Sequence, residues 1–229
     1  MNPFGQGAGV GRDRLPRGTH GIDPAAVLHS QRMRLHLAVL EAVARRGFTA
    51  TTVADILAGA KVSRRTFYQL FRGRDDCFAE AFDVAVAYIL ELLDAPRAEQ
   101  EHGSQWHTPL RRSLETYLRA LAENGECARA LHVESLVAGP IVAERRRFLK
   151  DALAQRMRAA FDRGRRAGDI PAAIPAAIFD ALIGAIDDRI RDCLDDHGPA
   201  ALPALAPQLH RFTLALFGVP EWPAAQRPQ

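Results

Sequence analysis

Residues 51–71 read TTVADILAGAKVSRRTFYQLF, and this stretch predicts two short helices separated by a tight break. Thr52 and Asp55 have the Thr-x-x-Asp spacing of a capping box, so the first helix should begin directly after Thr52. Apolar residues then recur at i, i+3, i+4 and i+7 from Val53 to Ala60, which gives this helix one apolar stripe. The helical pattern ends there, just before the break.

The second half of the stretch predicts a helix that begins after Ser63, whose side chain can cap it. Val62 and Phe67 have the spacing of a hydrophobic staple, and Phe67 and Phe71 form an inward aromatic stripe. The outer face carries cationic and hydrogen-bonding side chains, namely Arg64, Arg65, Thr66, Tyr68 and Gln69. A short helix packed by aromatic residues, with a cationic outer face, is typical of a helix-turn-helix that reads duplex DNA.

The charge distribution agrees with this prediction. The whole chain of 229 residues has a net charge of only +3. Residues 27–82 contain nine Lys and Arg against five Asp and Glu, whereas residues 83–229 contain eighteen against twenty. The positive excess therefore lies in the segment with the two short helices, where it could meet phosphates. A solvated basic face is the alternative, and charge alone does not decide between the two.

The composition argues against several other classes of protein. The cysteines Cys77, Cys127 and Cys193 are too far apart for a disulfide framework or a zinc site, which predicts a reducing cytoplasm. The N-terminus lacks a secretory apolar segment, and no apolar run approaches the ~20 residues of a membrane helix. The eight histidines and the acidic run over residues 187–197 lack metal-ligand spacing, and no GxSxG, P-loop or GxGxxG context occurs. We therefore expect no enzyme activity, no cofactor, no metal and no membrane.

Helical periodicity continues through the rest of the chain, and no strand pattern or internal repeat appears. The predicted fold is therefore all-α, with about nine helices. Residues 1–26 are rich in Gly and Arg and are expected to be a disordered tail, although a basic arm that reaches into a minor groove is conceivable. The predicted domains are a helix-turn-helix domain over residues 27–74, a larger helical domain over residues 75–218 and a loose tail over residues 219–229.

Turn and capping residues set the expected limits of the other helices. A long helix should begin at Arg74 and end before Pro96, because proline interrupts a helix. A shorter one should cover residues 127–137. The remaining helices are expected over residues 27–45, 108–124, 140–166 and 175–198, and in the region up to residue 217.

From about residue 34 to residue 78 the sequence resembles the tetracycline-repressor-like (TetR) family of transcriptional regulators. The resemblance is carried, in order and at fixed spacing, by Ala38, Gly47-Phe48, Thr51-Thr52-Val53, Asp55-Ile56, Ala60, Val62-Ser63, Thr66-Phe67-Tyr68, Phe71, Arg74 and Phe78. The rest of the chain is similar only in its series of helices of suitable length. The resemblance implies an N-terminal DNA-binding domain and a C-terminal domain that binds a small molecule and forms a homodimer.

The resemblance also implies contacts with DNA for nine residues, namely Thr52, Lys61, Ser63, Arg64, Arg65, Thr66, Tyr68, Gln69 and Arg74. Residues 63–66 are expected at base edges, since an Arg guanidinium can bond guanine bidentately. Thr52, Tyr68 and Arg74 are expected to contact phosphates. Lys61 stands where the family usually has Gly. If Lys61 has to adopt a positive φ, the cost is on the order of 1 kcal/mol. Either the turn differs, or the placement of a cation near phosphate offsets that cost.

The region after residue 175 is the expected dimer interface. One recognition helix reads too few base pairs for strong specificity, so such proteins bind palindromes as dimers. Small and apolar residues share one helical segment here, and two copies could form a four-helix bundle with the last helix. The expected interface residues are Ala181, Leu182, Gly184, Ala185, Asp188 and Phe212. The alternative is that this strip packs within its own subunit.

The expected ligand-binding residues are Phe82, Trp106, Tyr117, Glu134 and Phe161. The simpler alternative for each is an ordinary core or surface residue. Glu134 is the most informative, because its i±3 and i±4 neighbours are largely apolar and burial of an unpaired carboxylate is costly. Its partner is predicted to be either a cationic group of a ligand or an arginine such as Arg119 or Arg129.

Taken together, the sequence predicts a homodimeric cytoplasmic transcriptional regulator. The simplest form is a repressor that a small-molecule effector releases from a palindromic operator in double-stranded DNA. One alternative is a DNA-binding dimer controlled by a protein partner, without a small-molecule pocket. Another is a helical enzyme that merely resembles a regulator.

Overall fold

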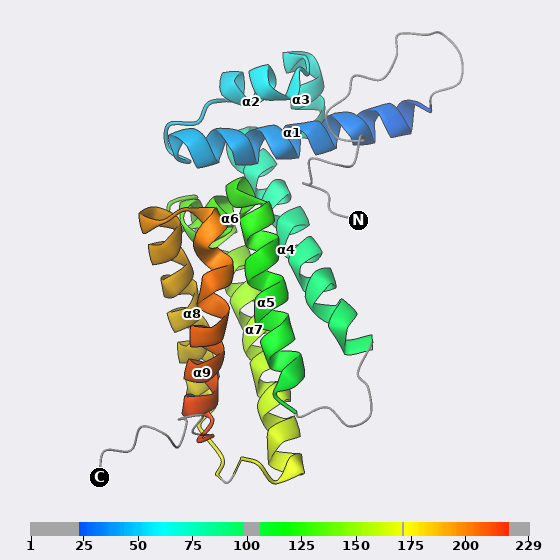
Figure 1. The fold of residues 1–229 in the computed structure, drawn as a ribbon. Helices are drawn as coiled ribbons and strands as arrows, with labels where there is room; N and C mark the ends of the chain where they lie inside the picture. Colours follow the sequence, from blue (N-terminus) through cyan, green and yellow to red (C-terminus); the bar gives the residue numbers. More distant parts are fainter. Residues whose placement is uncertain (1–22, 99–105, 171, 220–229) are drawn as a thin grey trace. The chain divides into compact units, whose positions relative to one another are not determined.

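The computed structural model describes residues 23–98, 106–170 and 172–219, and every regular element in these ranges is helical (Figure 1). The N-terminal helices are α1 (Pro24–Arg46), α2 (Val53–Ala60), α3 (Arg64–Leu70) and α4 (Arg74–Ala98). The later elements are α5 (Thr108–Glu123), α6 (Gly125–His132), α7 (Pro140–Ala167), α8 (Ala177–Asp196) and α9 (Ala206–Leu216), with 3-10 helices η1 (Glu134–Leu136) and η2 (Pro199–Leu205). The prediction of an all-α fold with about nine helices is confirmed.

Two helix limits differ modestly from the sequence prediction. α1 begins at Pro24 and not at residue 27, because the Asp23 carboxylate accepts a hydrogen bond from the Ala25 amide at 3.0 Å and caps the helix there. α4 continues through Pro96 and ends at Ala98. A proline near the end of a helix removes one hydrogen bond without requiring the helix to stop. The rest of the predicted N-terminal tail, up to residue 22, and residues 220–229 of the predicted C-terminal tail lie outside the described residues.

The single helix predicted over residues 127–137 is wrong, since α6 ends at His132 and η1 follows it. The Ser135 hydroxyl donates to the Leu131 carbonyl at 2.7 Å, and the Leu136 and Val137 amides bond to carbonyls three residues back. A hydroxyl that bonds to nearby backbone competes with the regular α-helical pattern, and the chain tightens into a 3-10 turn. Glu134 consequently lies on this turn and not within a regular helix.

The chain divides into two compact units. One comprises Met1–Leu90 and Glu123–Arg146, and the other comprises Glu91–Ala122 and Arg147–Gln229. The predicted domain boundary at residue 74 falls inside the first unit. The first unit also includes α6 and η1, which are distant from the helix-turn-helix in sequence.

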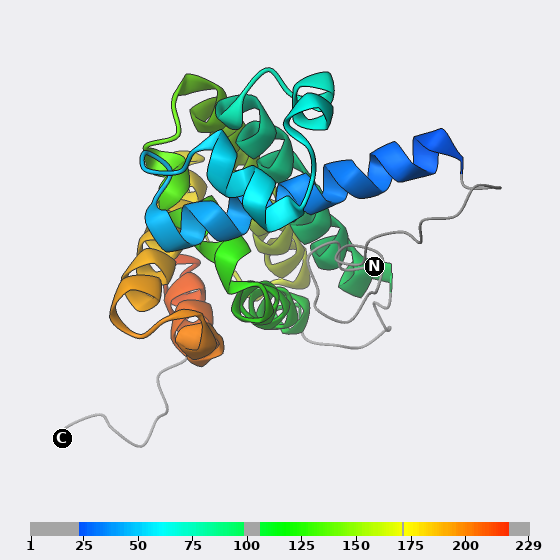
Figure 2. The ribbon, with the colours of Figure 1, turned by 90° about the horizontal axis from the view of Figure 1, so that it is seen from above.

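In the first unit, α2 and α3 lie on the same side of α1 (Figures 1 and 2). α1 packs against both α2 and α6. The α1–α2 contact is close, because a Cβ added to Gly59 would lie 3.1 Å from the Ala38 Cβ. Phe67, Phe71 and Phe78, each at most 2% exposed, form the aromatic part of this core.

In the second unit, α8 and α9 run side by side in opposite directions, joined by η2 (Figures 1 and 2). The core of this unit contains an aromatic cluster in which Phe217 contacts Phe161, Phe179 and Trp106, with ring centroids 5.1, 6.0 and 6.4 Å apart. Gly164 of α7 lies against this cluster. A Cβ there would approach the Trp106 ring to 2.8 Å, so the site needs glycine for close packing.

Candidate nucleic-acid interface

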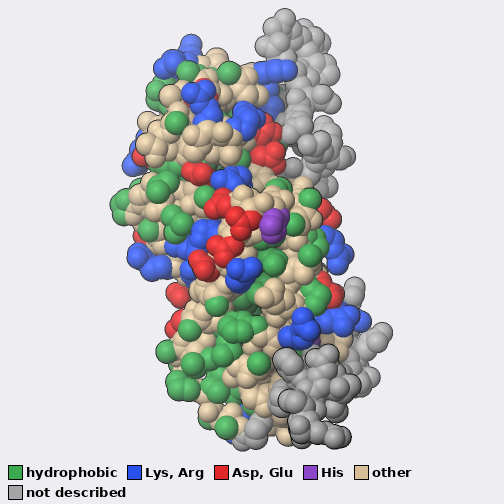
Figure 3. Space-filling model, turned by 60° about the vertical axis from the view of Figure 1, so that its left-hand side comes forward, with side chains coloured by type: hydrophobic (Ala, Val, Ile, Leu, Met, Phe, Trp, Pro, Cys, Tyr) green, Lys and Arg blue, Asp and Glu red, His purple; other side chains and the backbone are tan. Residues whose placement is uncertain are grey.

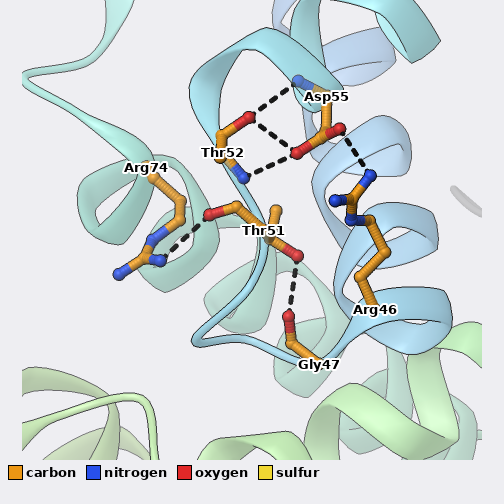
Figure 4. A network of polar contacts seen from close by, with 6 residues as sticks. All are labelled: Arg46, Gly47, Thr51, Thr52, Asp55 and Arg74. Atoms are coloured by element: carbon orange, nitrogen blue, oxygen red, sulfur yellow. Dashed lines mark hydrogen bonds and ion pairs between the residues drawn. The ribbon is translucent and has the colours of Figure 1, made fainter.

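α2 begins at a reciprocal cap formed by Thr52 and Asp55 (Figure 4). The Asp55 carboxylate accepts hydrogen bonds from the Thr52 hydroxyl at 2.6 Å and from the Thr52 amide at 2.9 Å, while the Thr52 oxygen accepts from the Asp55 amide at 3.3 Å. The predicted capping box is confirmed. These bonds from the Thr52 side chain and backbone stabilise the charged carboxylate and lower the pKa of Asp55. Arg46 Nη1 at the end of α1 also pairs with Asp55 at 3.0 Å, so the first turn of α2 is tied to α1.

The turn between α2 and α3 passes through Lys61, whose backbone is left-handed with φ 52° and ψ 41°. Lys61 is the single non-glycine residue with positive φ in the described parts of the chain. A side chain in this conformation costs about 1–2 kcal/mol, as anticipated from the absence of glycine. On α1, Arg34 Nη1 donates a hydrogen bond to the Ala60 carbonyl at 3.2 Å. A cation therefore lies at the C-terminal end of α2, directly before the turn.

α3 buries its aromatic face and exposes its polar face. Ser63 Oγ accepts from the Thr66 amide at 3.0 Å, which confirms the predicted cap. Phe67 is fully buried and packs on Phe71 with ring centroids 5.6 Å apart, whereas Tyr68 is 52% exposed. The exposed residues of the turn and of α3 are Lys61, Ser63, Arg64, Arg65, Tyr68 and Gln69. This face therefore presents guanidinium, ammonium, phenol and amide donors to solvent.

Arg74, at the start of α4, bonds to the protein's own backbone. Its Nη1 donates to the carbonyls of Phe48, Thr49 and Thr51 at 3.0, 3.3 and 3.0 Å; the bond to Thr51 is drawn in Figure 4. The guanidinium carbon lies over the Phe48 ring, 4.3 Å from its centroid. Nε pairs with the exposed Asp75 carboxylate at 2.8 Å. Arg74 thus fixes the loop between α1 and α2, a role that the sequence did not predict, and its phosphate contact stays a prediction.

Glu134 reaches the same loop from η1. Its Oε2 accepts a hydrogen bond from the Phe48 amide at 2.7 Å. The partner that the structure gives to this carboxylate is therefore a backbone N–H, and not the arginine or ligand cation expected from the sequence. Sequence periodicity could not reveal this pair, because the two residues are 86 positions apart.

The second unit contains a cavity of about 60 Å³ between α4, α5, α7 and α8. Most of its wall is apolar, and its polar groups are Ser113, Tyr117, Arg156 and Arg163. Arg156 Nη2 donates to the Asp94 carboxylate at 2.8 Å. The two arginines were not predicted as site residues. Their spacing of seven residues on α7, beside apolar residues, is nevertheless a signal that both face one side of the helix.

Of the five predicted ligand residues, Tyr117 lines this cavity. The other four do not. Phe82 is fully buried in the first unit, Glu134 holds the loop at Phe48, and Trp106 and Phe161 belong to the aromatic cluster. The sequence left open whether these aromatic residues are buried, and it could not say which interior space each one faces.

The predicted interface residues of α8 and α9 differ in exposure. Ala181 and Asp188 are exposed, Gly184 and Ala185 are partly buried, and Phe212 is 40% exposed. Leu182 is fully buried and packs in the core of its own unit. Successive helix residues lie ~100° apart, which separates Leu182 from the exposed Ala181. Figure 3 shows hydrophobic side chains gathered on the lower part of the α8 and α9 side.

The acidic run at the end of α8 forms ion pairs. The Asp187 carboxylate, only 6% exposed, forms ion pairs with Lys150 Nζ at 2.7 Å and with Arg191 Nη1 at 3.0 Å. The neighbouring Asp188 carboxylate pairs with Arg191 Nη2 at 2.7 Å. Among the described residues, no group of three or more His, Cys, Asp or Glu side chains is arranged to hold a metal ion. Within the same ranges, no helix has the length and apolar character needed to cross a membrane.

A family model described as bacterial regulatory proteins, tetR family, matches residues 38–81. The matched segment contains the second half of α1, the capped pair α2 and α3, and the first turns of α4. Residues 38–81 are therefore a tetR-family DNA-binding segment. The match and the exposed donor face of α3 together support DNA-binding transcriptional regulation as the function of this protein.

Solved structures of other regulators share the fold of this protein. The fatty acid degradation regulator FadR from Bacillus halodurans aligns with a TM-score of 0.70 at 15% identity, over 85% of this chain and 97% of that chain. FadR from Bacillus subtilis in complex with stearoyl-CoA aligns with a TM-score of 0.68 at 15% identity, over 80% and 97%. A TetR-like transcriptional regulator from Rhodococcus sp. RHA1 aligns with a TM-score of 0.61 at 22% identity, over 88% and 99%. No curated protein matches the sequence.

Proposed function

We propose that this protein is a TetR-family repressor that binds a palindromic operator as a homodimer and is released by a small-molecule effector. The observation that carries the proposal is the two-sided character of α3. Arg64, Arg65, Tyr68 and Gln69 are exposed, while Phe67 behind them is fully buried. A short capped helix that is anchored by aromatic residues and presents donors outward meets the requirements of major-groove recognition.

The exposed residues are assigned distinct roles. Arg64 and Arg65 are the base readers, because a guanidinium can donate two parallel hydrogen bonds to guanine O6 and N7. Tyr68 and Lys61 are assigned to phosphates, as are the unpaired amides in the first turn of α2. Both the amide and the hydroxyl proton of Thr52 are taken up by Asp55, so Thr52 contributes by orienting that turn.

Ser63, Thr66 and Gln69 complete the proposed DNA surface. The Ser63 and Thr66 hydroxyls lie 2.9 Å apart and hydrogen-bond to each other at the start of α3. These hydroxyls therefore stabilise the helix cap, and the hydrogen-bonding capacity that they retain is available to a base or a phosphate. Gln69 is exposed and offers an amide, which can pair with adenine.

Dimerisation is assigned to the outer faces of α8 and α9. The exposed Ala181 and the partly exposed Gly184 and Ala185 would let a second copy approach closely, and Phe212 would supply a larger apolar contact. Two copies would form a four-helix bundle and place the α3 helices about one DNA turn apart, ~34–36 Å. The spacing between half-sites then becomes the quantity that an effector can change.

The cavity of the second unit is the proposed effector site. Its apolar wall suits an apolar body, while Ser113, Tyr117 and Arg156 offer polar contacts for a polar or anionic group. A regulator with the same fold was solved in complex with stearoyl-CoA, an amphipathic molecule of this kind. Since the cavity is only about 60 Å³, a long chain would have to widen it. Release from DNA requires that the effector prefer the DNA-incompetent state, and DNA must then weaken effector binding by the same factor.

Selection of binding sites from random duplex DNA tests the DNA-binding part of the proposal. The full-length protein should enrich a palindrome with half-sites about one helical turn apart. Failure to enrich any sequence would remove the assignment of α3 as a base reader. Enrichment of a single half-site, bound by a monomer, would contradict the proposed homodimer.

Titration of stearoyl-CoA into the operator complex tests the effector part, with free coenzyme A as the control. Release by stearoyl-CoA but not by coenzyme A is the expected result. If acyl-CoAs of every chain length tested leave the complex intact, the proposal of an amphipathic effector is wrong. Control by a protein partner then becomes the better candidate.

A further inference from the structure

The loop between α1 and α2 is held from two directions by residues that are distant in sequence. The Phe48 amide donates to Glu134 of η1 at 2.7 Å, and the Phe48 carbonyl accepts from Arg74 of α4 at 3.0 Å. The Phe48 ring is buried and packs on Phe78, with centroids 5.1 Å apart. Both backbone polar groups of Phe48 and its side chain are therefore fixed.

This fixed loop leads directly into the cap of α2. The Thr51 hydroxyl donates to the Gly47 carbonyl at 2.8 Å, and the Thr51 amide donates to the Phe48 carbonyl at 3.2 Å (Figure 4 shows the first of these). The next residue, Thr52, is the N-cap of α2. Only three residues separate Phe48 from this cap, and they are tied together by hydrogen bonds. A displacement at the Phe48 amide would therefore be passed to the start of α2.

Glu134 lies on a short 3-10 turn that is followed by an exposed segment. It is partly buried, and the following residues Leu136 and Val137 are 51% and 61% exposed. The bond from the Ser135 hydroxyl to Leu131 joins η1 to the end of α6. A shift of α6 would consequently carry the Glu134 carboxylate with it.

We propose that Glu134 is a positioning residue that sets the orientation of the helix-turn-helix through its hydrogen bond to the Phe48 amide. The proposal rests on the proposed DNA-binding function. A charged acceptor strengthens this bond relative to a neutral one. Movement of α6 and η1 changes the position of α2, and with it the affinity for DNA. Glu134 acts on DNA through the loop and touches neither DNA nor effector.

The first experiment measures amide hydrogen exchange of residues 47–56 in the full-length protein without DNA. Glu134→Ala should speed exchange at Phe48 by about tenfold, the loss expected for a hydrogen bond to a charged acceptor, and should also speed exchange at the α2 cap. Glu134→Gln keeps an acceptor oxygen and should restore most of the protection. Glu126→Ala removes the same charge from an exposed position on α6 and is the matched control. Acceleration confined to Phe48 would overturn the proposal, since the loop would not transmit the change.

The second experiment measures affinity for the selected operator with the same variants, each confirmed to be folded by circular dichroism. Glu134→Ala should bind about tenfold more weakly, Glu134→Gln should recover most of this loss, and Glu126→Ala should match the wild type. Equal affinity of Glu134→Ala and Glu126→Ala would overturn the inference while leaving the proposed function intact. If the wild type itself fails to bind any duplex, the proposed function fails, and the exchange result alone decides whether Glu134 positions the loop.

Discussion

Replacement of Arg74 separates two roles that the sequence and the structure give to the same side chain. Arg74→Ala removes the Nη1 bonds to the three loop carbonyls and the guanidinium above the Phe48 ring. Hydrogen bonds from a charged group contribute roughly 1.5–3 kcal/mol, and a partly exposed cation–π contact adds about 0.5–1 kcal/mol. The pair with Asp75 adds little, because that carboxylate is 68% exposed. We expect Arg74→Ala to lower the free energy of unfolding by about 2–4 kcal/mol.

Urea unfolding followed by circular dichroism measures this loss, and Arg74→Lys is the matched variant. Lysine keeps the charge but lacks the planar fork that spans several carbonyls, so it should recover less than half of the stability. Binding to random duplex at several salt concentrations then tests the phosphate contact. Each phosphate contact contributes about 0.9 to the slope of log affinity against log salt. If Arg74 acts only on the loop, this slope does not change.

Two results would refute the reasoning. One is a free energy of unfolding of Arg74→Ala that lies within about 0.5 kcal/mol of the wild-type value, which is the range of an ordinary surface substitution. The other is a salt slope that falls by about 0.9 for each protomer with no loss of stability. In that case the guanidinium contacts phosphate in the complex, and its bonds to the loop carbonyls are dispensable.

Other expectations follow from the helix-turn-helix itself. Arg65→Ala should relax base preference at one operator position by about 1–3 kcal/mol, and equal weakening on operator and random duplex would instead mark a phosphate contact. Tyr68→Phe should weaken binding to all duplexes alike in gel-shift titrations, whereas a changed preferred site would contradict a phosphate role. Lys61→Gly should raise the free energy of unfolding by about 1 kcal/mol in urea titrations, because glycine tolerates the positive φ; a loss of stability would show that the turn does not strain Lys61. The pKa of Asp55 is lower in the folded protein than its ordinary value of 3.8, so the charged carboxylate stabilises the fold at pH values above 3.8. This stabilisation is lost as the pH falls through the pKa of the folded protein. Asp55→Asn should therefore reduce the loss of thermal stability below pH 3.8, and an unchanged acid dependence would show that the cap does not depend on the charge.

The sequence by itself determined the features that depend on neighbours within one or two helical turns. Thr52 with Asp55 and Ser63 with Thr66 form their predicted caps, because a cap joins residues three positions apart. The burial of Phe67 beside the exposed Tyr68 likewise follows from helical periodicity. The position of the turn was also indicated, since the family resemblance implies glycine where Lys61 stands, but only the structure shows that Lys61 has a positive φ.

Only the tertiary structure decided which partners the longer-range polar groups take. Arg74 and Glu134 were charged residues with several possible uses, and the fold directs both to the loop around Phe48. The cavity is likewise a property of packing, because periodicity shows that a side chain is buried but not which gap it borders. Leu182 shows the same limit at a surface, since a residue on the stripe predicted for a partner is completely covered by its own unit. Local hydrogen bonds are fixed by spacing along the chain, whereas these choices depend on which helices meet in three dimensions.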